Sequence, residues 1–498
     1  MSPLGSGHEA RALAPRVAKG VRWSLLDLTL QQGMRFAVTI TLARLIAPED
    51  FGLLVMALVF SALAGLVGDL GLGPALVQRR SITQQHVSTA FVVTVVVGAA
   101  LSLCLFLASG PIAGFYDQSD LQAVLIALSP VFLCRGLAGV PRDLLRRSMR
   151  FDQLALASII AVALGGAVGI VMGIQGAGIW ALSAQVVVET LASTCLALLL
   201  AWRTRAWSPG LSFDRQALRE LVGFGAFVSG TRIASYAVTN IDNLIVGKIL
   251  GPISLGLYNL AYRLMLFPIL RVADVVANVT MPALASLQDE PLRVAPAFHK
   301  AAKYVAVLCF PASLGIAVAA PVLIPALFGA NWTAAIGVTQ VLALNGPRLA
   351  LARLSGAVYE GMGKPAWDFA MLTITFAVCL PAFLIGVQWG IVGMAWSYTL
   401  SGYLLFPVDQ YLVHRSMKAS AVPLARSLVP VVMSTVIMCA VGASVLRLIP
   451  ETTSDITSGA VVLLVCGISY AGALRVSAPG RLTEIWLLAA GRYGRRPD

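Results

Sequence analysis

The stretch LLDLTLQQGMRFAVTITLARLIAPEDFGLL, residues 25–54, combines a long apolar run with polar side chains near its middle. Asp27, Gln31, Arg35 and Thr39 are spaced by four residues, so on an α-helix they form one polar stripe. An arginine at the centre of a bilayer costs roughly 2.5–3.5 kcal/mol on insertion scales. The stretch therefore predicts a membrane helix whose polar face is turned away from lipid.

The composition of the whole chain gives the same class. Of 498 residues, 58% are hydrophobic and 12% are charged, whereas soluble domains carry about 25% charged residues. Runs of about twenty apolar residues recur throughout, so we predict an all-α polytopic membrane protein with about fourteen transmembrane helices. The predicted spans are 23–46, 51–72, 89–110, 121–140, 154–174, 177–201, 220–248, 254–276, 304–327, 336–358, 367–387, 390–412, 424–447 and 457–475.

The placement of lysine and arginine predicts the orientation. With the N-terminus in the cytoplasm, 26 of the 36 basic residues fall in predicted inside segments, and only Arg44, Lys248 and Arg447 fall outside. Basic residues favour the cytoplasmic side, so we expect both termini there. The net charge of +13 is dispersed over many short loops. That dispersal indicates contact with anionic phospholipid and argues against nucleic-acid binding.

A short internal sequence repeat predicts a duplicated architecture. ARLIAPEDFGLLVMA (43–57) aligns with GKILGPISLGLYNLA (247–261), pairing Pro48 with Pro252 and Gly52 with Gly256. Six predicted spans separate the copies, so the repeats are parallel. We predict two six-helix lobes around a central cavity plus two extra C-terminal helices. The segments are a cytoplasmic N-terminal segment (1–22), an N-lobe (23–201), a cytoplasmic linker (202–219), a C-lobe (220–412), the last two spans (413–478) and a basic amphipathic tail (479–498).

Polar side chains inside the predicted spans mark the candidate binding site. Arginine binds phosphate through two parallel hydrogen bonds, so several arginines in a shared wet cavity predict an anionic cargo carrying phosphate or pyrophosphate. Tyrosines beside them are suited to sugars. The candidate substrate-binding residues are Gln31, Arg35, Arg232, Tyr236, Asn259, Tyr262, Arg263, Asn345 and Arg348.

A structural explanation of these charges stays open beside the functional one. Each arginine can pair with a nearby carboxylate, as Arg271 can with Asp274, or extend to the membrane surface, as we expect for Arg135. Asp27, Asp242 and Asp274 are candidate sites for coupling to H⁺ or Na⁺, or they neutralise arginines and cap helices. The seven cysteines form no CxxC pair, and we expect no metal site, no catalytic residue and no other cofactor.

Several motifs resemble the Wzx-type polysaccharide transporters, especially their WzxC-like branch, within the multidrug/oligosaccharidyl-lipid/polysaccharide (MOP) exporter superfamily. They are LARLIAPEDFGLLVMALVF (42–60), DLGLGPALVQR (69–79), GVPRDLLRRSMRF (139–151), GIWALSAQ (178–185), NIDNLIVGKILGPISLGLYNLAYRL (240–264) and PALASLQD (282–289). The resemblance implies a bacterial inner-membrane flippase for an undecaprenyl-diphosphate-linked oligosaccharide, working by alternating access in exopolysaccharide or lipopolysaccharide synthesis. It also implies functional partners, a polysaccharide polymerase and glycosyltransferases. In a related flippase the last two helices line a groove for the lipid tail.

Two other functions remain as alternatives. A lipid-linked glycosyltransferase or polymerase is expected to carry a large periplasmic loop, whereas the predicted outside loops are short, and the chain has no HExxH or Walker A motif. A cation-coupled small-molecule exporter on the same fold is expected to have isolated carboxylates in a greasier cavity. The arginines favour the flippase, and we expect no enzymatic activity.

Overall fold

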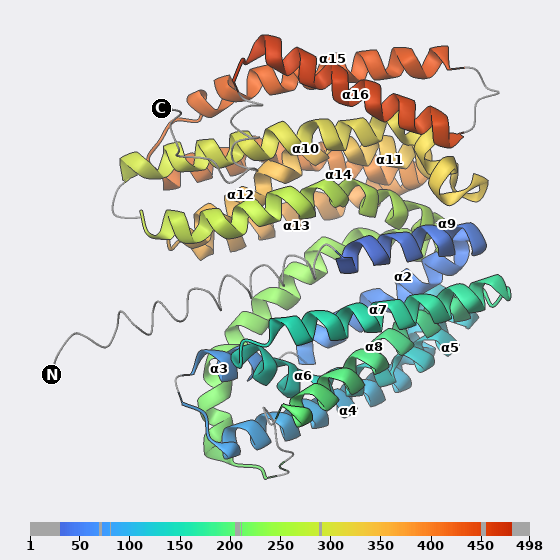
Figure 1. The fold of residues 1–498 in the computed structure, drawn as a ribbon, viewed down its shortest axis with the longest axis vertical. Helices are drawn as coiled ribbons and strands as arrows, with labels where there is room; N and C mark the ends of the chain where they lie inside the picture. The colour runs from blue at the N-terminus through green and yellow to red at the C-terminus, as the bar shows by residue number, and fades with distance from the viewer. Residues whose placement is uncertain are drawn as a thin grey trace. The chain divides into compact units, whose positions relative to one another are not determined.

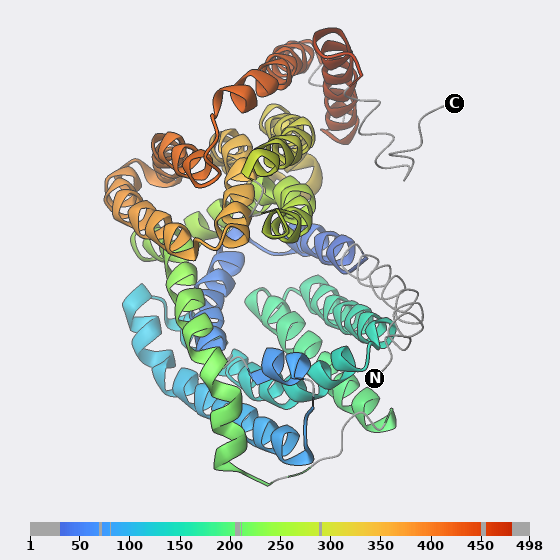
Figure 2. The ribbon, with the colours of Figure 1, turned by 90° about the vertical axis from the view of Figure 1, so that its left-hand side faces the viewer.

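The chain folds into helices throughout its described part. The computed structural model describes residues 30–68, 72–79, 81–204, 210, 212–287, 291–449 and 455–480, and within these ranges no strand is present. Two compact units divide the chain, Met1–Ile253 and Ser254–Asp498. The predicted all-α class is confirmed, and Figures 1 and 2 show the helices of each unit from two sides.

The first unit is built from long helices joined by short turns. Its helices are residues 30–45, α2 (Pro48–Gly68), α3 (Leu72–Gln78), α4 (Gln84–Tyr116), α5 (Ser119–Leu128), α6 (Pro130–Arg147), α7 (Phe151–Ile174), α8 (Ile179–Arg203) and the first part of α9 (Arg215–Ala285). One buried cluster joins α3, α4 and α6 through Leu72, Leu76, Ala90, Leu144 and Leu145.

Small residues let α7 and α8 pack closely, as Figure 1 shows. A Cβ at Gly165 of α7 would lie 2.7 Å from the main-chain oxygen of Gln185 and 2.7 Å from the Cβ of Glu189, both on α8. At Gly169 it would lie 3.0 Å from the Cβ of Gln185. Membrane helices associate through such close backbone approaches, because burial of apolar surface drives little between helices in lipid. This contact sets the position of Glu189.

Both copies of the internal sequence repeat, residues 43–57 and 247–261, contain a break in the helix. The helix of residues 30–45 ends just before Pro48, where α2 begins. In α9 the only non-helical backbone lies at Gly251, with φ 80° and ψ −179°, immediately before Pro252. A positive φ is readily adopted only by glycine, and proline removes a helical hydrogen bond. The two copies therefore share a structural feature as well as a sequence pattern.

The second unit continues from the kink in α9. Its elements are the rest of α9, α10 (Pro291–Phe328), η1 (Ala330–Trp332), α11 (Ala335–Leu344), α12 (Gly346–Gly361), α13 (Pro365–Gly386), η2 (Val387–Trp389), α14 (Gly390–Ser416), α15 (Val422–Leu448) and α16 (Asp455–Ser477). Its main core centres on α10, where Phe298, Val305 and Cys309 are fully or almost fully buried. The paired helices α15 and α16 pack against α10.

Two of the predicted spans are each made of two helices. Pro130 separates α5 from α6 within predicted span 121–140, and Pro347, near the start of α12, follows the break after α11 within predicted span 336–358. Proline cannot donate the helical hydrogen bond, so a break before it is expected. These spans are the fourth and the tenth, which are counterparts in the predicted duplication.

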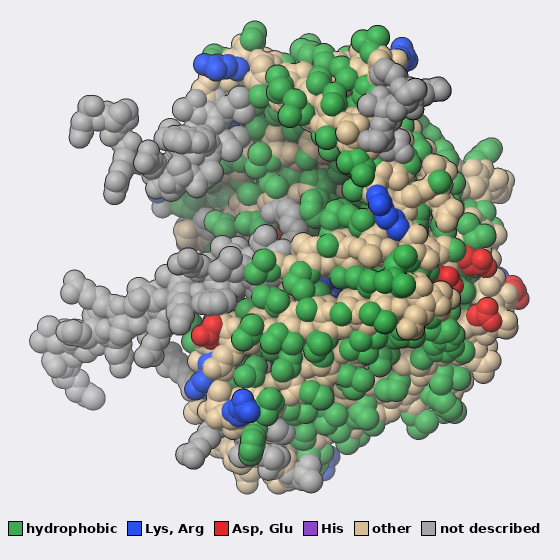
Figure 3. All heavy atoms as spheres, turned by 45° about the vertical axis from the view of Figure 1, so that its right-hand side comes forward, with side chains coloured by type: hydrophobic (Ala, Val, Ile, Leu, Met, Phe, Trp, Pro, Cys, Tyr) green, Lys and Arg blue, Asp and Glu red, His purple; other side chains and the backbone are tan. Residues whose placement is uncertain are grey.

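The surface of the described helices is that of a membrane protein. Leu107, Val171 and Leu404 are among many large apolar side chains that are more than half exposed, and hydrophobic side chains cover most of the face in Figure 3. Ten helical segments of the described residues are long and apolar enough to cross a membrane. The count of fourteen spans and the lobe boundaries stay predictions, and residues 1–22 and 481–498 lie outside the described residues.

Candidate functional site

A cavity lined with arginines lies inside the first unit. It has a volume of about 420 Å³, within the range of roughly 300–1,000 Å³ of small-molecule sites. We call it the arginine cavity. Its lining comes from four helices and consists of Gln31 and Arg35 (residues 30–45), Arg135, Arg142 and Arg146 (α6), Phe151, Leu154, Ser158 and Ala161 (α7), and Glu189, Thr190 and Ser193 (α8).

The helical periodicity of α6 brings three of these arginines to one side. Arg135, Arg142 and Arg146 are separated by seven and four residues, which places them on a single face of the helix. Other residues of α6, among them Leu145, are buried in the core of the first unit. Arg135 also lies against α2, because a Cβ at Gly65 would be 3.2 Å from its Nη1 atom.

An ion pair joins the helix of residues 30–45 to α8 across the cavity. Nη1 of Arg35 donates to Oε2 of Glu189 at 3.1 Å, and Nη2 donates to Oε1 of the same carboxylate. The side chain of Arg35 is 43% exposed and that of Glu189 is 18% exposed. The geometry is the two-point pairing of guanidinium and carboxylate, which a phosphate group can also adopt.

The three arginines of α6 are held less tightly. Arg142 donates to the hydroxyl of Ser193 on α8. Arg146 contacts Asp143 on its own helix at 3.2 Å, and its side chain is 60% exposed. Within the part of the chain that the structure describes, Arg135 makes no hydrogen bond. Four guanidinium groups face one carboxylate, so the lining is strongly cationic and suited to a multiply charged anion.

The predicted site residues fall into two groups, one in each unit. Gln31 and Arg35 lie together in the arginine cavity. Tyr236 is also in the first unit, but its hydroxyl donates to the main-chain oxygen of Val59 at 3.1 Å. Asp27 lies outside the described residues, and so does the side chain of Arg232.

In the second unit the predicted arginines are held by amides of their own helices. Arg263 donates through Nε to Asn259 Oδ1 at 2.8 Å, and Arg348 donates through Nε to Asn345 Oδ1 at 2.6 Å. The guanidinium of Arg348 also lies against Gly402 of α14, where a Cβ would be 2.6 Å from its Nε.

Tyr262 meets a second aromatic side chain in the same unit. Its hydroxyl lies 3.4 Å from that of Tyr398, with the rings edge to face and their centroids 5.8 Å apart. The prediction of a cavity shared by both lobes stays a prediction, as does a role in binding for these residues.

The predicted coupling carboxylates have separate environments. Asp242 is buried, and its Oδ1 accepts from the main-chain N–H of Asn243 at 2.8 Å. Asp274 forms an ion pair with Arg353 at 3.7 Å, in agreement with the structural explanation of an arginine balanced by a local acid. Among the described residues no group of three His, Cys, Asp or Glu side chains could hold a metal ion.

The structure adds two observations on α6. Arg135, which we expected to extend to the membrane surface, lines the arginine cavity. α6 continues through Arg147, beyond the end of the predicted span at residue 140. The helical spacing of Arg135, Arg142 and Arg146 indicates that they share one face of a helix. The predicted span of residues 121–140 ended before Arg142, so this spacing was not noticed. Glu189, a single carboxylate inside span 177–201, was also missed as a site residue.

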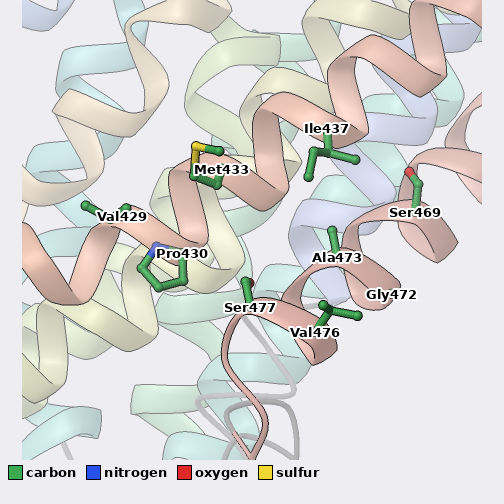
Figure 4. Close-up of a pocket in the computed structure, with 9 residues that line it drawn as sticks. All are labelled: Val429, Pro430, Met433, Ile437, Ser469, Gly472, Ala473, Val476 and Ser477. Atoms are coloured by element: carbon green, nitrogen blue, oxygen red, sulfur yellow. The ribbon is translucent and has the colours of Figure 1, made fainter.

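An apolar groove of about 540 Å³ lies between α15 and α16 in the second unit. Figure 4 shows Met433 and Ile437 of α15 opposite Ala473 and Val476 of α16. Its full lining is Val429, Pro430, Met433, Ile437, Ser469, Gly472, Ala473, Val476 and Ser477. A Cβ at Gly472 would meet nothing within 4 Å, so this glycine leaves the groove open.

Comparison with known families places these features in context. Residues 41–337, more than half of the chain, match the family model described as polysaccharide biosynthesis protein. The chain belongs to this polysaccharide biosynthesis family. It is a multi-pass membrane protein, and the Wzx-type resemblance predicted from its motifs is confirmed.

Relatives in this family come from different bacteria. The lipopolysaccharide biosynthesis protein WzxC of Escherichia coli (strain K12) is 26% identical over 392 residues, covering 78% of this chain and 79% of the relative. The teichuronic acid biosynthesis protein TuaB of Bacillus subtilis (strain 168) is 26% identical over 413 residues, covering 81% and 83%. The succinoglycan biosynthesis transport protein ExoT of Rhizobium meliloti (strain 1021) is 26% identical over 463 residues, covering 91% and 92%.

Solved structures show that the fold is shared more widely than the polysaccharide biosynthesis family. The lipid II flippase MurJ in an inward closed conformation matches with a TM-score of 0.71 at 13% identity, over 95% of this chain and 100% of that one. An inward-facing multidrug resistance MATE family transporter of the MOP superfamily matches with a TM-score of 0.60 at 15% identity, over 80% and 99%.

Proposed function

We propose that this protein moves an undecaprenyl-diphosphate-linked oligosaccharide repeat unit from the cytoplasmic to the periplasmic leaflet of the bacterial inner membrane. Such a carrier serves exopolysaccharide or lipopolysaccharide synthesis by alternating access and is not an enzyme. Relatives over most of the chain are described as proteins of lipopolysaccharide, teichuronic acid and succinoglycan biosynthesis, and the last is described as a transport protein.

The arginine cavity is the observation that carries this proposal. A diphosphate crossing the roughly 30 Å hydrocarbon core unaccompanied would lose its hydration, at a cost of tens of kcal/mol for an isolated charge. Arg35, Arg135, Arg142 and Arg146 offer guanidinium groups from two helices, and Glu189 is the one acid among the described lining residues. Charge-assisted hydrogen bonds from these groups to phosphate oxygens would replace the lost water.

The groove between α15 and α16 is suited to the lipid portion of the same cargo. Its walls are apolar, apart from the hydroxyls of Ser469 and Ser477. From Val429 to Ile437 it follows α15 for about 12 Å at 1.5 Å per residue. A polyprenyl chain is long, uncharged and flexible, so it can lie in such a groove while the diphosphate is held elsewhere.

The same proposal also implies an energy source for transport and a set of functional partners. Moving a charged lipid repeatedly in one direction needs a driving force, for which we propose coupling to H⁺ or Na⁺. The glycosyltransferases that build the repeat unit would supply the cargo, and a polysaccharide polymerase would consume it. Anionic phospholipids would contact the basic loops.

A cation-coupled exporter of small molecules is the second candidate, favoured by the likeness to MATE transporters. That likeness shows the fold alone. A cavity with four arginines and one glutamate repels cationic cargo, and this disfavours the second candidate.

Binding to the purified full-length protein in lipid nanodiscs tests the proposal. The probes are undecaprenyl diphosphate, undecaprenol and inorganic pyrophosphate. Arg142→Ala removes one charge-assisted hydrogen bond of about 1.5–3 kcal/mol, so affinity for both diphosphates falls roughly ten- to hundredfold. Gly472→Phe fills the groove and weakens only the probes that carry the polyprenyl chain.

The matched control is Arg447→Ala, which removes an arginine from the last turn of α15 and leaves the cavity lining intact. We expect its affinities to equal those of the wild type. Equal affinity of Arg142→Ala and Arg447→Ala for inorganic pyrophosphate would refute the role of the arginine cavity.

A further inference from the structure

Two histidines meet where α10 and α14 pack together in the second unit. Nε2 of His299 lies 3.1 Å from Nε2 of His414, and the ring centroids are 5.3 Å apart. Phe298 closes one side, with its ring edge to face against His414 at 5.8 Å. The chain contains four histidines in all, so two of them face each other inside one membrane unit.

The surrounding hydrogen bonds determine which ring nitrogens carry protons. Nδ1 of His414 lies 2.7 Å from the main-chain oxygen of Gln410, and a carbonyl can only accept. Nδ1 of His414 is therefore protonated, and in the neutral ring Nε2 carries a lone pair. The facing contact is then a hydrogen bond only if Nε2 of His299 donates. The neutral pair has one proton between the rings.

The same geometry limits how many further protons the pair accepts. A first added proton binds Nδ1 of His299, and His299 still donates through Nε2 to His414. A second would place N–H groups on both facing nitrogens and bring two imidazolium charges together. Like charges at this separation repel strongly, so the second proton breaks the contact between α10 and α14.

Burial distinguishes the two rings. His299 is half-buried, whereas His414 is only 3% exposed. When Nδ1 of His299 gains a proton from water, its Nε2 proton can pass to Nε2 of His414. His299 is then neutral with its proton on Nδ1, and His414 is the imidazolium. One proton has moved from the accessible ring to the buried ring while the heavy atoms stay in place.

A buried acid lies on the same helix as His414. Asp409 is 9% exposed and accepts hydrogen bonds from Ser355 at 2.7 Å, Tyr359 at 3.1 Å and Gln410 at 3.2 Å. It precedes His414 by five residues, so on an α-helix the two side chains project from different faces. Its hydrogen-bond partners here are neutral side chains of α12 and α14.

The other charged and titratable groups on the packed elements are both cationic and anionic. They include Arg293, Lys300, Lys303 and Tyr304 of α10, Arg353, Tyr359 and Glu360 of α12, Asp368 of α13, Tyr411 and Arg415 of α14, Arg426 of α15, Arg475 of α16, and Lys364 and Lys418 in the turns. Asp409 is the buried acid nearest in sequence to His414.

We propose that His299 and His414 form a proton-binding site that holds a single proton between α10 and α14. The site is independent of the diphosphate cargo proposed above. It takes up a proton through His299, and a second proton opens the contact.

Nitrogen NMR of full-length protein labelled with ¹⁵N-histidine, in nanodiscs and purified without a histidine tag, tests the site directly. His299→Gln and His414→Gln assign the signals of these two rings. At high pH we expect His414 as the Nδ1–H tautomer and His299 as the Nε2–H tautomer. On acidification the pair takes up two protons in steps separated by more than about one pH unit.

Hydrogen exchange supplies a second measurement if one variant folds poorly. In the wild type, amide hydrogen exchange at the start of α10 and the end of α14 should rise only at pH values low enough for the second proton to bind. His86→Gln, which changes a histidine of the first unit, should leave both steps in place. Two rings in the same tautomer, or titrations that coincide with those of the single variants, would overturn the proposal.

Discussion

The arginines of the two units differ in what balances them. In the first unit Arg35, Arg135, Arg142 and Arg146 face one cavity. Arg35 pairs with Glu189, Arg142 donates to Ser193 and Arg146 pairs with Asp143, whereas Arg135 makes no hydrogen bond within the described residues. In the second unit each described arginine within the polar stripes has its own local partner. Arg263 has Asn259, Arg348 has Asn345, and Arg353 has Asp274.

The difference indicates that arginine has two uses in this protein, although placing its charge inside a membrane costs free energy. A guanidinium inside a membrane protein is tolerated when something satisfies it. Local amides and acids do so permanently in the second unit, which stabilises the helix that carries the arginine. In the first unit four guanidinium groups share one cavity, and Arg135 makes no hydrogen bond within the described residues, so an anion from outside can satisfy it.

The largest expected effect breaks this contrast directly. Arg135→Ala removes a guanidinium that makes no hydrogen bond within the described residues, and we expect polysaccharide export to fall about a hundredfold. Arg263→Ala removes one whose Nε is already bound, and we expect a loss of less than about tenfold. Export is measured as surface polymer in cells lacking their own transporter, at matched membrane levels of each variant. Equal losses would remove the distinction between the units.

A smaller effect sharpens the role of helix packing in the first unit. Gly165→Ala places a Cβ 2.7 Å from Glu189 and from the main chain of α8, so α7 and α8 must separate. Overpacking of this kind costs roughly 1–3 kcal/mol, which should appear as a lower unfolding temperature and weaker pyrophosphate binding. Gly139→Ala on α6 is the matched control, because its Cβ meets nothing within 4 Å. If both variants unfold at one temperature, the contact does not position Glu189.

The smallest effect has the opposite sign. Glu189→Gln keeps the shape of the side chain and removes the only acid among the described residues of the cavity lining, which leaves Arg35 to other acceptors. We expect inorganic pyrophosphate to bind about three- to tenfold more tightly, since a competing anion has been removed. Calorimetry on the purified variant measures this change. Weaker binding would mean that Glu189 orients Arg35 for the cargo instead of competing with it.

The helices were predictable because hydrophobic length and helical spacing are local properties of the chain. Apart from α3 and η1, which lie almost wholly or wholly between predicted spans, the described helices overlap the predicted spans or extend them, and Gln31 and Arg35 were correctly predicted to share a face. The breaks at Pro130 and Gly251 carry local signals as well, namely a missing N–H and a missing Cβ.

The partners of the site residues were not predictable in the same way. Glu189 lies 154 residues from Arg35, and only the close packing of α7 on α8 sets its position. The pairing of His299 with His414 spans 115 residues and depends on how α10 meets α14. The end of α6 was not predictable either, because hydropathy marks where the apolar run ends near residue 140, whereas the helix continues to Arg147.

The pairing of Arg35 with Glu189 also bears on the return half of the proposed cycle. A carrier must come back unloaded, and a cavity of bare guanidinium groups would make that step the slow one. The carboxylate on α8 lowers the charge that the empty protein carries by one. The cargo-bound and cargo-free forms of the protein are then closer in electrostatic energy, so neither half of the transport cycle becomes much slower than the other.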